Sequence, residues 1–217
     1  VTFIAQKTGG AMTDLRVQSV GERAANAIVS YAAYILKMLW PTKLAAFYPV
    51  GPDGHSVSTV AASAALLAVL SVAAVMLRQR ARFLTVGWLW YVLTLIPVIG
   101  LVQVGSQAMA DRYTYVPLVG LFVAVAWGVP EMFRQLSGRW LAVPAVVVIA
   151  ALAVKAYVQV GYWRNTRVLA EHAIAVVPNN YKAHFDLGLV LAHENKTDEA
   201  IRQYQIALSV YPNNDTV

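Results

Sequence analysis

The sequence contains no cysteine, so disulfide bonds, thiol nucleophiles and cysteine-ligated metals are all excluded. Charged residues are also scarce, at 13% of the 217 residues, whereas hydrophobic residues make up 59%. The mean hydropathy of +0.55 is far from the usual balance of soluble proteins. A single large soluble core does not explain this composition.

The motifs of common soluble enzymes are missing as well. There is no Walker loop, no GxGxxG, no HExxH and no GxSxG. The histidines, His55, His172, His184 and His193, do not have the spacing of metal ligands. The sequence therefore predicts no metal site, and no cofactor is evident.

Long uncharged apolar runs are the main feature that is present. The first runs over 57–77, and about 20 apolar residues are enough to cross a bilayer as a helix. Similar runs give predicted spans at 83–102, 114–133 and 140–160. We therefore expect an all-α, multi-span helical membrane domain over 57–160, followed by a polar region over 161–217.

Arginines in the links between these spans predict their orientation. Arg78, Arg80 and Arg82 follow the first span, and Arg134 and Arg139 follow the third. The positive-inside rule places both links in the cytoplasm, so 1–56, 103–113 and 161–217 would lie on the outer face. The net positive charge lies entirely before residue 161. Membrane topology explains it better than nucleic acid, which we do not expect as a partner.

Residues 20–40 mix charged and apolar positions and end at Trp40 and Pro41. This segment is long enough to span, but its end charges suit an amphipathic helix lying in the plane of the outer interface. Pro97 and Gly100 in the second span allow a kink or local unwinding, although ordinary packing explains them as well. Because the chain opens with Val1 and a short apolar stretch, we expect a piece of a longer protein.

The polar region contains an internal repeat. The tripeptide at 178–180 recurs at 212–214, a period of 34 residues. The residues expected to pack a helix pair in this register are Leu187, Gly188, Ala200, Tyr204, Ala207 and Pro212. They resemble the tetratricopeptide pattern and imply an α-solenoid with a half repeat at 163–178 and a full repeat at 181–214. His184 and Leu191 depart from the aromatic types usual at their places.

The loop before the third span holds the main candidate site. Arg112 would provide a cation for a lipid phosphate, bordered by Tyr113, or would be an ordinary interfacial anchor. Asp111 would act in catalysis or merely cap the helix. Gln103 and Gln107 would bind sugar hydroxyls or nothing.

A second candidate cluster on the same face contains Lys43 and Tyr48, in the segment WPTKLAAFYP. It follows directly after the helix predicted at 20–40. Together with Arg112, Asp111, Tyr113 and Gln107, these two residues complete the predicted site for a donor phosphate and its sugar.

Three stretches carry a resemblance to a known family: RAANAIVSYAAYILKMLWPTKLAAFYP, GWLWYVLTLIPVIGLVQVGSQAMADRYTYVPLVGLFVAVAWG and WRNTRVLAEHAIAVVPNN. The chain resembles the bacterial relatives of the transmembrane and tetratricopeptide-repeat O-mannosyltransferases. The resemblance implies a C-type glycosyltransferase that uses a polyprenyl-phosphate sugar donor, with repeats that engage an acceptor protein. It also implies a bacterial inner membrane with the repeats in the periplasm.

In that superfamily the catalytic acid lies in an outer loop near the N-terminus, so we expect it upstream of Val1 and expect this chain alone to be inactive. Whether a full-length enzyme needs a divalent metal is open. Two other functions remain: an oligosaccharide ligase or polymerase, and a membrane-anchored scaffold that collects envelope proteins with its repeats.

Overall fold

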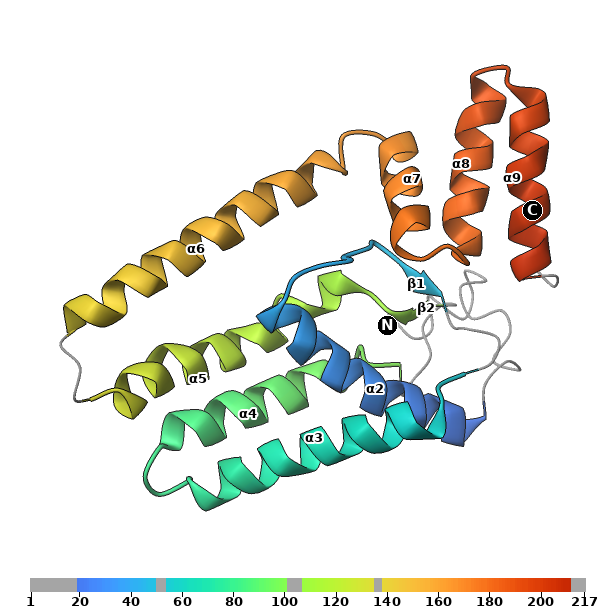
Figure 1. The fold of residues 1–217 in the computed structure, drawn as a ribbon. Coiled ribbons are helices and arrows are strands. Elements are labelled where there is room, and N and C mark those ends of the chain that lie inside the picture. The colour runs from blue at the N-terminus through green and yellow to red at the C-terminus, as the bar shows by residue number, and fades with distance from the viewer. Residues whose placement is uncertain (1–18, 50–53, 101–106, 135–137, 212–217) are drawn as a thin grey trace, which may run out of the picture. The chain divides into compact units, whose positions relative to one another are not determined.

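The computed structural model describes residues 19–49, 54–100, 107–134 and 138–211 (Figure 1). These residues form eight α-helices, one short 3-10 helix and two strands of two and three residues. The predicted all-α fold is therefore confirmed. The chain divides into a first unit of residues 1–40 and 50–147 and a second unit of residues 41–49 and 148–217, which we describe separately.

Four helices make up most of the first unit: α2 (Val20–Leu39), α3 (Val57–Met76), α4 (Arg82–Leu95) and α5 (Pro117–Met132). They lie side by side in Figure 1, where α2 packs on α3 and α4 packs on α5. A capping box explains where α2 begins, because the Ser19 hydroxyl accepts from the Glu22 N–H and the Glu22 carboxylate accepts from the Ser19 N–H. Ser56 caps α3 in a similar way.

The core of this unit lies where α2 meets α4 and the start of α5. Its buried members are Ala27, Tyr34, Ile35, Tyr91, Leu95, Ile99 and Leu121. Two tyrosines join the helices through polar contacts: the Tyr91 hydroxyl donates to the Tyr31 carbonyl at 2.6 Å, and the Tyr31 hydroxyl donates to the Val92 carbonyl at 2.8 Å. Helix α2 is therefore a packed member of the unit, while its predicted in-plane orientation stays a prediction.

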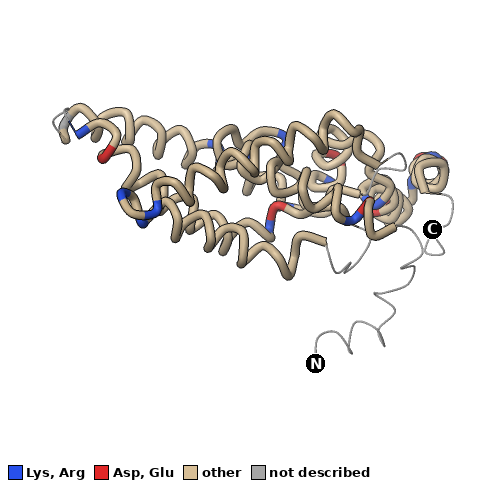
Figure 2. Tube along the Cα trace, turned by 90° about the horizontal axis from the view of Figure 1, so that it is seen from below, with Lys and Arg blue, Asp and Glu red and all other residues tan. Residues whose placement is uncertain are grey.

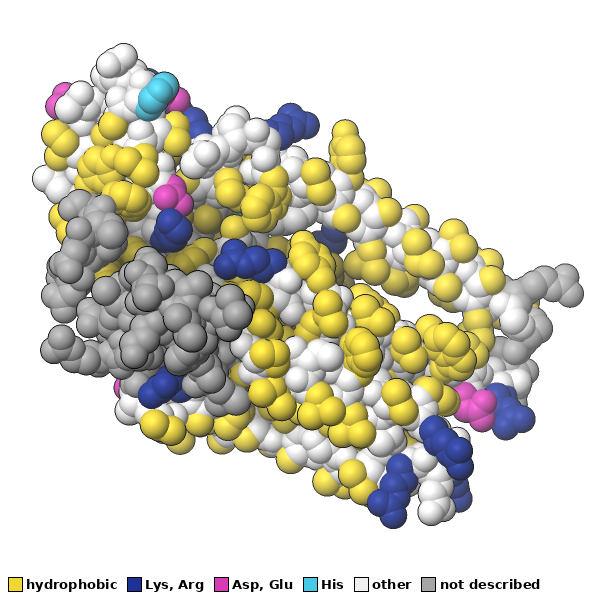
Figure 3. Space-filling view, turned by 180° about the vertical axis from the view of Figure 1, so that it is seen from behind, with side chains coloured by type: hydrophobic (Ala, Val, Ile, Leu, Met, Phe, Trp, Pro, Cys, Tyr) yellow, Lys and Arg dark blue, Asp and Glu magenta, His cyan; other side chains and the backbone are white. Residues whose placement is uncertain are grey.

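The outer surface of the helices is apolar. Helices α3 and α6 (Gly138–Gly161) contain stretches long and apolar enough to cross a membrane, and only 11% and 0% of these stretches are buried. Figure 3 shows hydrophobic side chains spread over the exposed surface of the helices. Such exposure costs about 25 cal/mol per Å² in water, so these two helices do not behave as core helices of a soluble protein.

Two helices are shorter than the spans predicted from the sequence. The predicted span 83–102 overlaps α4, which has 14 residues, begins at Arg82 and ends at Leu95. A turn follows through Pro97 to Gly100 at φ 90°. Proline disfavours helix at the residue before it and lacks an N–H, which explains the early end. The predicted span 114–133 contains α5, which has 16 residues and begins at Pro117. Residues 101–106 lie outside the described part.

Helices α3, α4 and α5 alternate in direction, which brings the arginine-rich links of this unit to one end. Arg78 and Arg80 lie between α3 and α4, Arg82 begins α4, and Arg134 follows α5. Figure 2 shows these cations gathered at that end of the unit. The starts of α3 and α5 and the end of α4 lie at the opposite end, as does the loop before α5. The side of the membrane that each end faces stays a prediction.

The second unit contains α7 (Thr166–Val176), α8 (Tyr181–His193) and α9 (Thr197–Val210), which lie side by side in Figure 1. Asn165 caps α7 and Asn180 caps α8 through their side-chain oxygens. The core between these helices consists of Ala170, Leu187, Leu191 and Ala200, packed against Ile174 and Tyr204.

Most residues expected to pack the helix pair lie in the seam, the contact between α8 and α9. Gly188 is buried, and a Cβ there would lie 2.5 Å from the Tyr204 ring. Ala200 is 2% exposed and Ala207 is fully buried. Pro212 lies outside the described residues, and the tetratricopeptide assignment itself stays a prediction.

His184 and Leu191, which depart from the usual aromatic types, are both buried in α8. The His184 Nε2 lies 3.0 Å from the Pro178 carbonyl oxygen, and its Nδ1 lies 2.7 Å from the Gln203 side-chain oxygen. The imidazole thus joins α8 to the preceding turn and to α9. Polar contacts of His184 take the place of the packing that an aromatic ring would make at this position.

Gly120→Ala should destabilise the first unit. A Cβ at Gly120 would collide with the Gly87 carbonyl oxygen and would lie 2.8 Å from the Trp90 ring, so α4 and α5 would have to separate. Overpacking of this kind costs about 1 to 3 kcal/mol. We expect a lower Tm for the protein in detergent. Gly128→Ala is the matched control, because its Cβ would meet Phe83 at an ordinary 3.5 Å. Equal Tm values for the two variants would contradict this close helix crossing.

Ala200→Trp should disrupt the α8–α9 pair, because the indole has no room in a seam that leaves Ala200 2% exposed. Gln205→Trp, at an exposed position of the same helix, is the control. Hydrogen exchange of α8 and α9 amides in the whole protein measures the effect. Similar protection of these amides in both variants would show that the seam does not depend on a small residue at position 200.

Candidate functional site

The candidate site in the first unit is built on the loop before α5. Strand β2 (Gln107–Met109) leads through Ala110 into the 3-10 helix η1 (Asp111–Thr114). The Thr114 hydroxyl donates to the Asp111 carbonyl at 2.7 Å, which closes this tight turn. Pro117, fully buried at the first position of α5, then begins the helix with the φ angle that a first turn requires.

Helix α2 holds this loop by its backbone. The Tyr34 hydroxyl donates to the Ala110 carbonyl and accepts from the Ala110 N–H, both at 3.0 Å. Eight residues closer to the start of α2, the Asn26 amide donates to the Ala108 carbonyl at 2.9 Å. Asn26, Tyr34 and Ala110 are all at most 5% exposed. The position of the loop is therefore fixed by buried hydrogen bonds from one face of α2.

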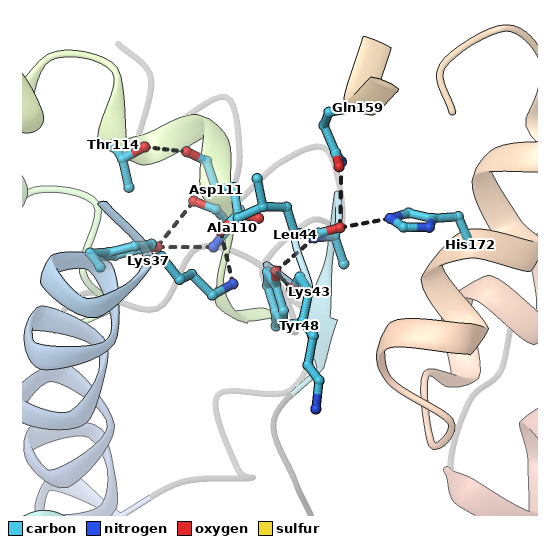
Figure 4. Close-up of polar contacts among 11 residues, drawn as sticks. Lys37, Lys43, Leu44, Tyr48, Ala110, Asp111, Thr114, Gln159 and His172 are labelled. Carbon is cyan, nitrogen blue, oxygen red and sulfur yellow. Dashed lines mark hydrogen bonds and ion pairs between the residues drawn. The ribbon is translucent and has the colours of Figure 1, made fainter. Parts of the chain in front are cut away.

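An ion pair extends the same face of α2. The Lys37 ammonium lies 3.1 Å from an Asp111 carboxylate oxygen, and both side chains are about one-fifth exposed, at 20% and 24% (Figure 4). Burial lowers the pKa of Lys37, while the negative charge of Asp111 and its hydrogen bond oppose that shift. Burial also raises the pKa of the neighbouring Tyr34, which keeps its phenol neutral.

Arg112 is exposed and contacts two partly buried side chains, Gln107 and Tyr113. Its Nη2 donates to the Gln107 side-chain oxygen at 3.3 Å, and its guanidinium carbon lies 5.2 Å from the centre of the Tyr113 ring. The Gln107 amide in turn donates to the Tyr113 hydroxyl. Within the described part of the chain, Arg112 pairs with no carboxylate. It therefore presents a positive charge backed by an aromatic ring and an amide.

Lys43 and Tyr48 belong to the second unit. The Tyr48 hydroxyl donates to the Lys43 carbonyl at 2.8 Å and accepts from the Ala45 N–H at 2.6 Å, which closes a turn around Lys43 at φ 54°. The phenol of Tyr48 is thus engaged in local structure. The expectation that these residues share a face with Arg112 stays a prediction.

The segment that contains this turn is held by its backbone carbonyls. The Leu44 carbonyl lies 3.4 Å from the Gln159 amide nitrogen and 3.0 Å from the His172 Nε2 (Figure 4). The Asn180 amide donates to the Phe47 carbonyl at 2.9 Å, and strand β1 (Tyr48–Pro49) follows. Four side chains of the second unit, counting Lys155 at 3.5 Å from the Pro41 carbonyl, therefore bind the backbone carbonyls of 41–49, and the Phe47 ring also packs edge-on against Tyr181.

Sequence reasoning missed the residues of α2 that position the loop. Asn26, Tyr34 and Lys37 lie on one face of α2, and helical periodicity predicts that shared face. Periodicity does not predict that their partners are in the loop before α5. Gln103 lies outside the described residues. Within the ranges that the structure describes, no group of three or more His, Asp or Glu side chains could hold a metal ion.

The chain is similar to protein O-mannosyl-transferases. A Caenorhabditis elegans protein of that name is 26% identical over 188 residues, which are 84% of this chain and 26% of the relative. Human protein O-mannosyl-transferase TMTC4 is 28% identical over 127 residues, 58% of this chain and 17% of its own. Human TMTC1 is 26% identical over 130 residues, 58% of this chain and 15% of its own.

The chain thus spans about a quarter or less of the length of these relatives. No known family profile matches it, and no solved structure matches it.

Proposed function

We propose that this chain is the membrane and repeat portion of a glycosyltransferase that moves a sugar from a polyprenyl-phosphate donor to an acceptor protein on the outer face of the membrane. The similarity to protein O-mannosyl-transferases supports transfer to protein and makes mannose the first sugar to test. In this proposal the enzyme has a C-type architecture, lies in a bacterial inner membrane and carries its catalytic acid upstream of Val1.

The observation that carries the proposal is the placement of Arg112. This exposed cation lies on the loop that leads into α5, at the end of the apolar helical unit opposite the arginine-rich links. A donor with a polyprenyl chain needs an apolar surface for the lipid and a cation for the phosphate, next to each other. Arginine suits the phosphate because its planar guanidinium donates two parallel hydrogen bonds.

The apolar surface beside Arg112 fits the lipid part of such a donor. Tyr115 and Val116, which follow η1, are exposed, as are Val119 and Phe122 on the first turns of α5. In water this surface would be unfavourable, but against acyl chains or a polyprenyl tail it is not. Gln107, held between Arg112 and Tyr113, is the nearest amide for a sugar hydroxyl.

In this proposal the second unit serves the acceptor. Its helices α7, α8 and α9 correspond to a half repeat and one full repeat of a tetratricopeptide array. Such arrays form extended surfaces that bind other polypeptides. The side chains that contact the 41–49 backbone are an example, within this chain, of how the unit binds a non-helical segment through its carbonyl groups.

Reporter fusions test the orientation on which the proposal depends. A fusion after Leu77 should report the cytoplasm, since Arg78, Arg80 and Arg82 follow it, and a fusion after Gly161 should report the outer side. Both reporters on one side would contradict the outer-face acceptor.

Arg112→Ala should weaken donor binding in the full-length enzyme. Loss of one charge-assisted hydrogen bond already costs about 1.5 to 3 kcal/mol, so the KM for polyprenyl-phosphate mannose should rise at least about 10- to 100-fold. Arg112→Lys keeps the charge but not the planar fork and should fall between wild type and Arg112→Ala. Mannose transfer is measured against donor concentration in membranes with matched protein levels.

Arg134→Ala is the control for that experiment. Arg134 is also an exposed arginine of the first unit, but it lies at the opposite end and pairs with Glu131 at 3.2 Å. Its replacement should leave the donor KM unchanged. An unchanged KM for Arg112→Ala would make Arg112 an interfacial anchor and would favour the scaffold function.

A further inference from the structure

We infer that Lys37 is a positioning residue for donor binding: it holds the Asp111 carboxylate and so leaves the adjacent Arg112 free for the donor phosphate. This inference rests on the proposed function. Asp111 and Arg112 are neighbours in a 3-10 helix of four residues, so an unpaired Asp111 carboxylate would be a permanent intramolecular competitor for the guanidinium. Opposite charges at such short range attract each other strongly near a protein surface.

The ion pair in the structure removes that competitor. Asp111 faces α2, where Lys37 lies 3.1 Å away, whereas Arg112 faces Gln107, a neutral amide, at 3.3 Å. The other described acids of the first unit are also engaged elsewhere: Glu22 accepts from the Ser19 N–H and Glu131 pairs with Arg134. Each described carboxylate of this unit therefore has a partner other than Arg112.

The hydrogen bonds from α2 to the loop backbone keep Asp111 and Arg112 pointed at different partners. Tyr34 fixes both peptide groups of Ala110, the residue directly before Asp111, so the direction in which Asp111 leaves the chain is set by buried hydrogen bonds. Lys37 lies three residues beyond Tyr34, on the same face of α2. One helix face therefore both orients the loop and neutralises its acid.

Charge counting separates this role from a purely structural one. Lys37, Asp111 and Arg112 together carry a net charge of +1. Lys37→Met reduces it to 0 and releases Asp111 toward Arg112. Adding Asp111→Asn to Lys37→Met restores +1 and removes the competitor. A structural role for Lys37 would make the double variant at least as defective as the single one, whereas the proposed role predicts rescue.

The experiment measures mannose transfer by the full-length enzyme in membranes, at matched protein levels, against polyprenyl-phosphate mannose concentration. Lys37→Met should raise the donor KM about tenfold with little change in kcat, since about 1.4 kcal/mol of phosphate attraction would be lost. Lys37→Arg, which keeps the charge, should stay near wild type. The Lys37→Met, Asp111→Asn double variant should return to within about threefold of the wild-type KM. A double variant as impaired as Lys37→Met, or a wild-type KM for Lys37→Met, would overturn the inference.

Two further variants keep the outcomes separable. If Arg112→Ala raises the donor KM but Lys37→Met does not, the inference fails and the proposed function stands; if Arg112→Ala has no effect, the proposed function itself fails. If Lys37→Met does not accumulate in membranes, the single variant Asp111→Asn tests the inference by itself. It should keep or lower the donor KM, and a raised KM or a large loss of kcat would overturn the inference, because Asp111 would then act on the donor or in catalysis.

Discussion

The reciprocal hydrogen bonds between the Tyr34 hydroxyl and Ala110 are the contact on which the candidate site depends. Ala110 is fully buried, so its N–H would be left without a partner if the phenol were removed, while its carbonyl would keep only the hydrogen bond that it accepts from the Tyr113 N–H at 3.0 Å. Each buried, unsatisfied backbone group costs about 1 to 3 kcal/mol. Such a cost is large beside the few kcal/mol by which domains are stable, so the loop has one favourable position. The directions of Asp111 and Arg112 follow from that position.

The first unit differs from a soluble domain in its outer surface, which is apolar, while its apolar core also contains polar contacts between side chains and backbone. Tyr31, Tyr34 and Tyr91 donate to backbone carbonyls between helices, and the Trp88 indole donates to the Ser71 hydroxyl at 3.2 Å. Lipid offers no hydrogen bonds and no hydrophobic drive between helices, so close packing and internal polar contacts must hold such helices together. The crossing of Gly87 and Gly120 supplies the close packing. Helices α3 and α6, which are long and apolar enough to cross a membrane, are almost unburied, as expected for helices that face lipid.

Much of the fold could be predicted from local signals. The capping residues Ser19 and Glu22 and the closing Trp40 mark α2, and small residues such as Gly188 and Ala200 mark the α8–α9 seam. The early end of α4 at Leu95 was signalled by Pro97, but hydropathy alone extended the span past it. The pairing of Lys37 with Asp111 joins residues 74 positions apart. Helical periodicity assigns Lys37 to a face of α2 but does not identify its partner. From the sequence alone, the charge of Lys37 is therefore explained by an amphipathic helix at the membrane interface.

The Lys37–Asp111 pair is better explained by the site than by stability. Burial lowers the pKa of Lys37, which means that the protein environment disfavours its charge even with Asp111 present. Partly buried pairs of this kind add little net stability, and an apolar side chain of similar volume often packs equally well. The pair does, however, decide which charge of the sequence Asp111-Arg112 faces the protein and which faces outward. Because α2 takes up the acid, the exposed face of the loop is left cationic, and a cationic loop beside an apolar surface is what a lipid-linked phosphate requires.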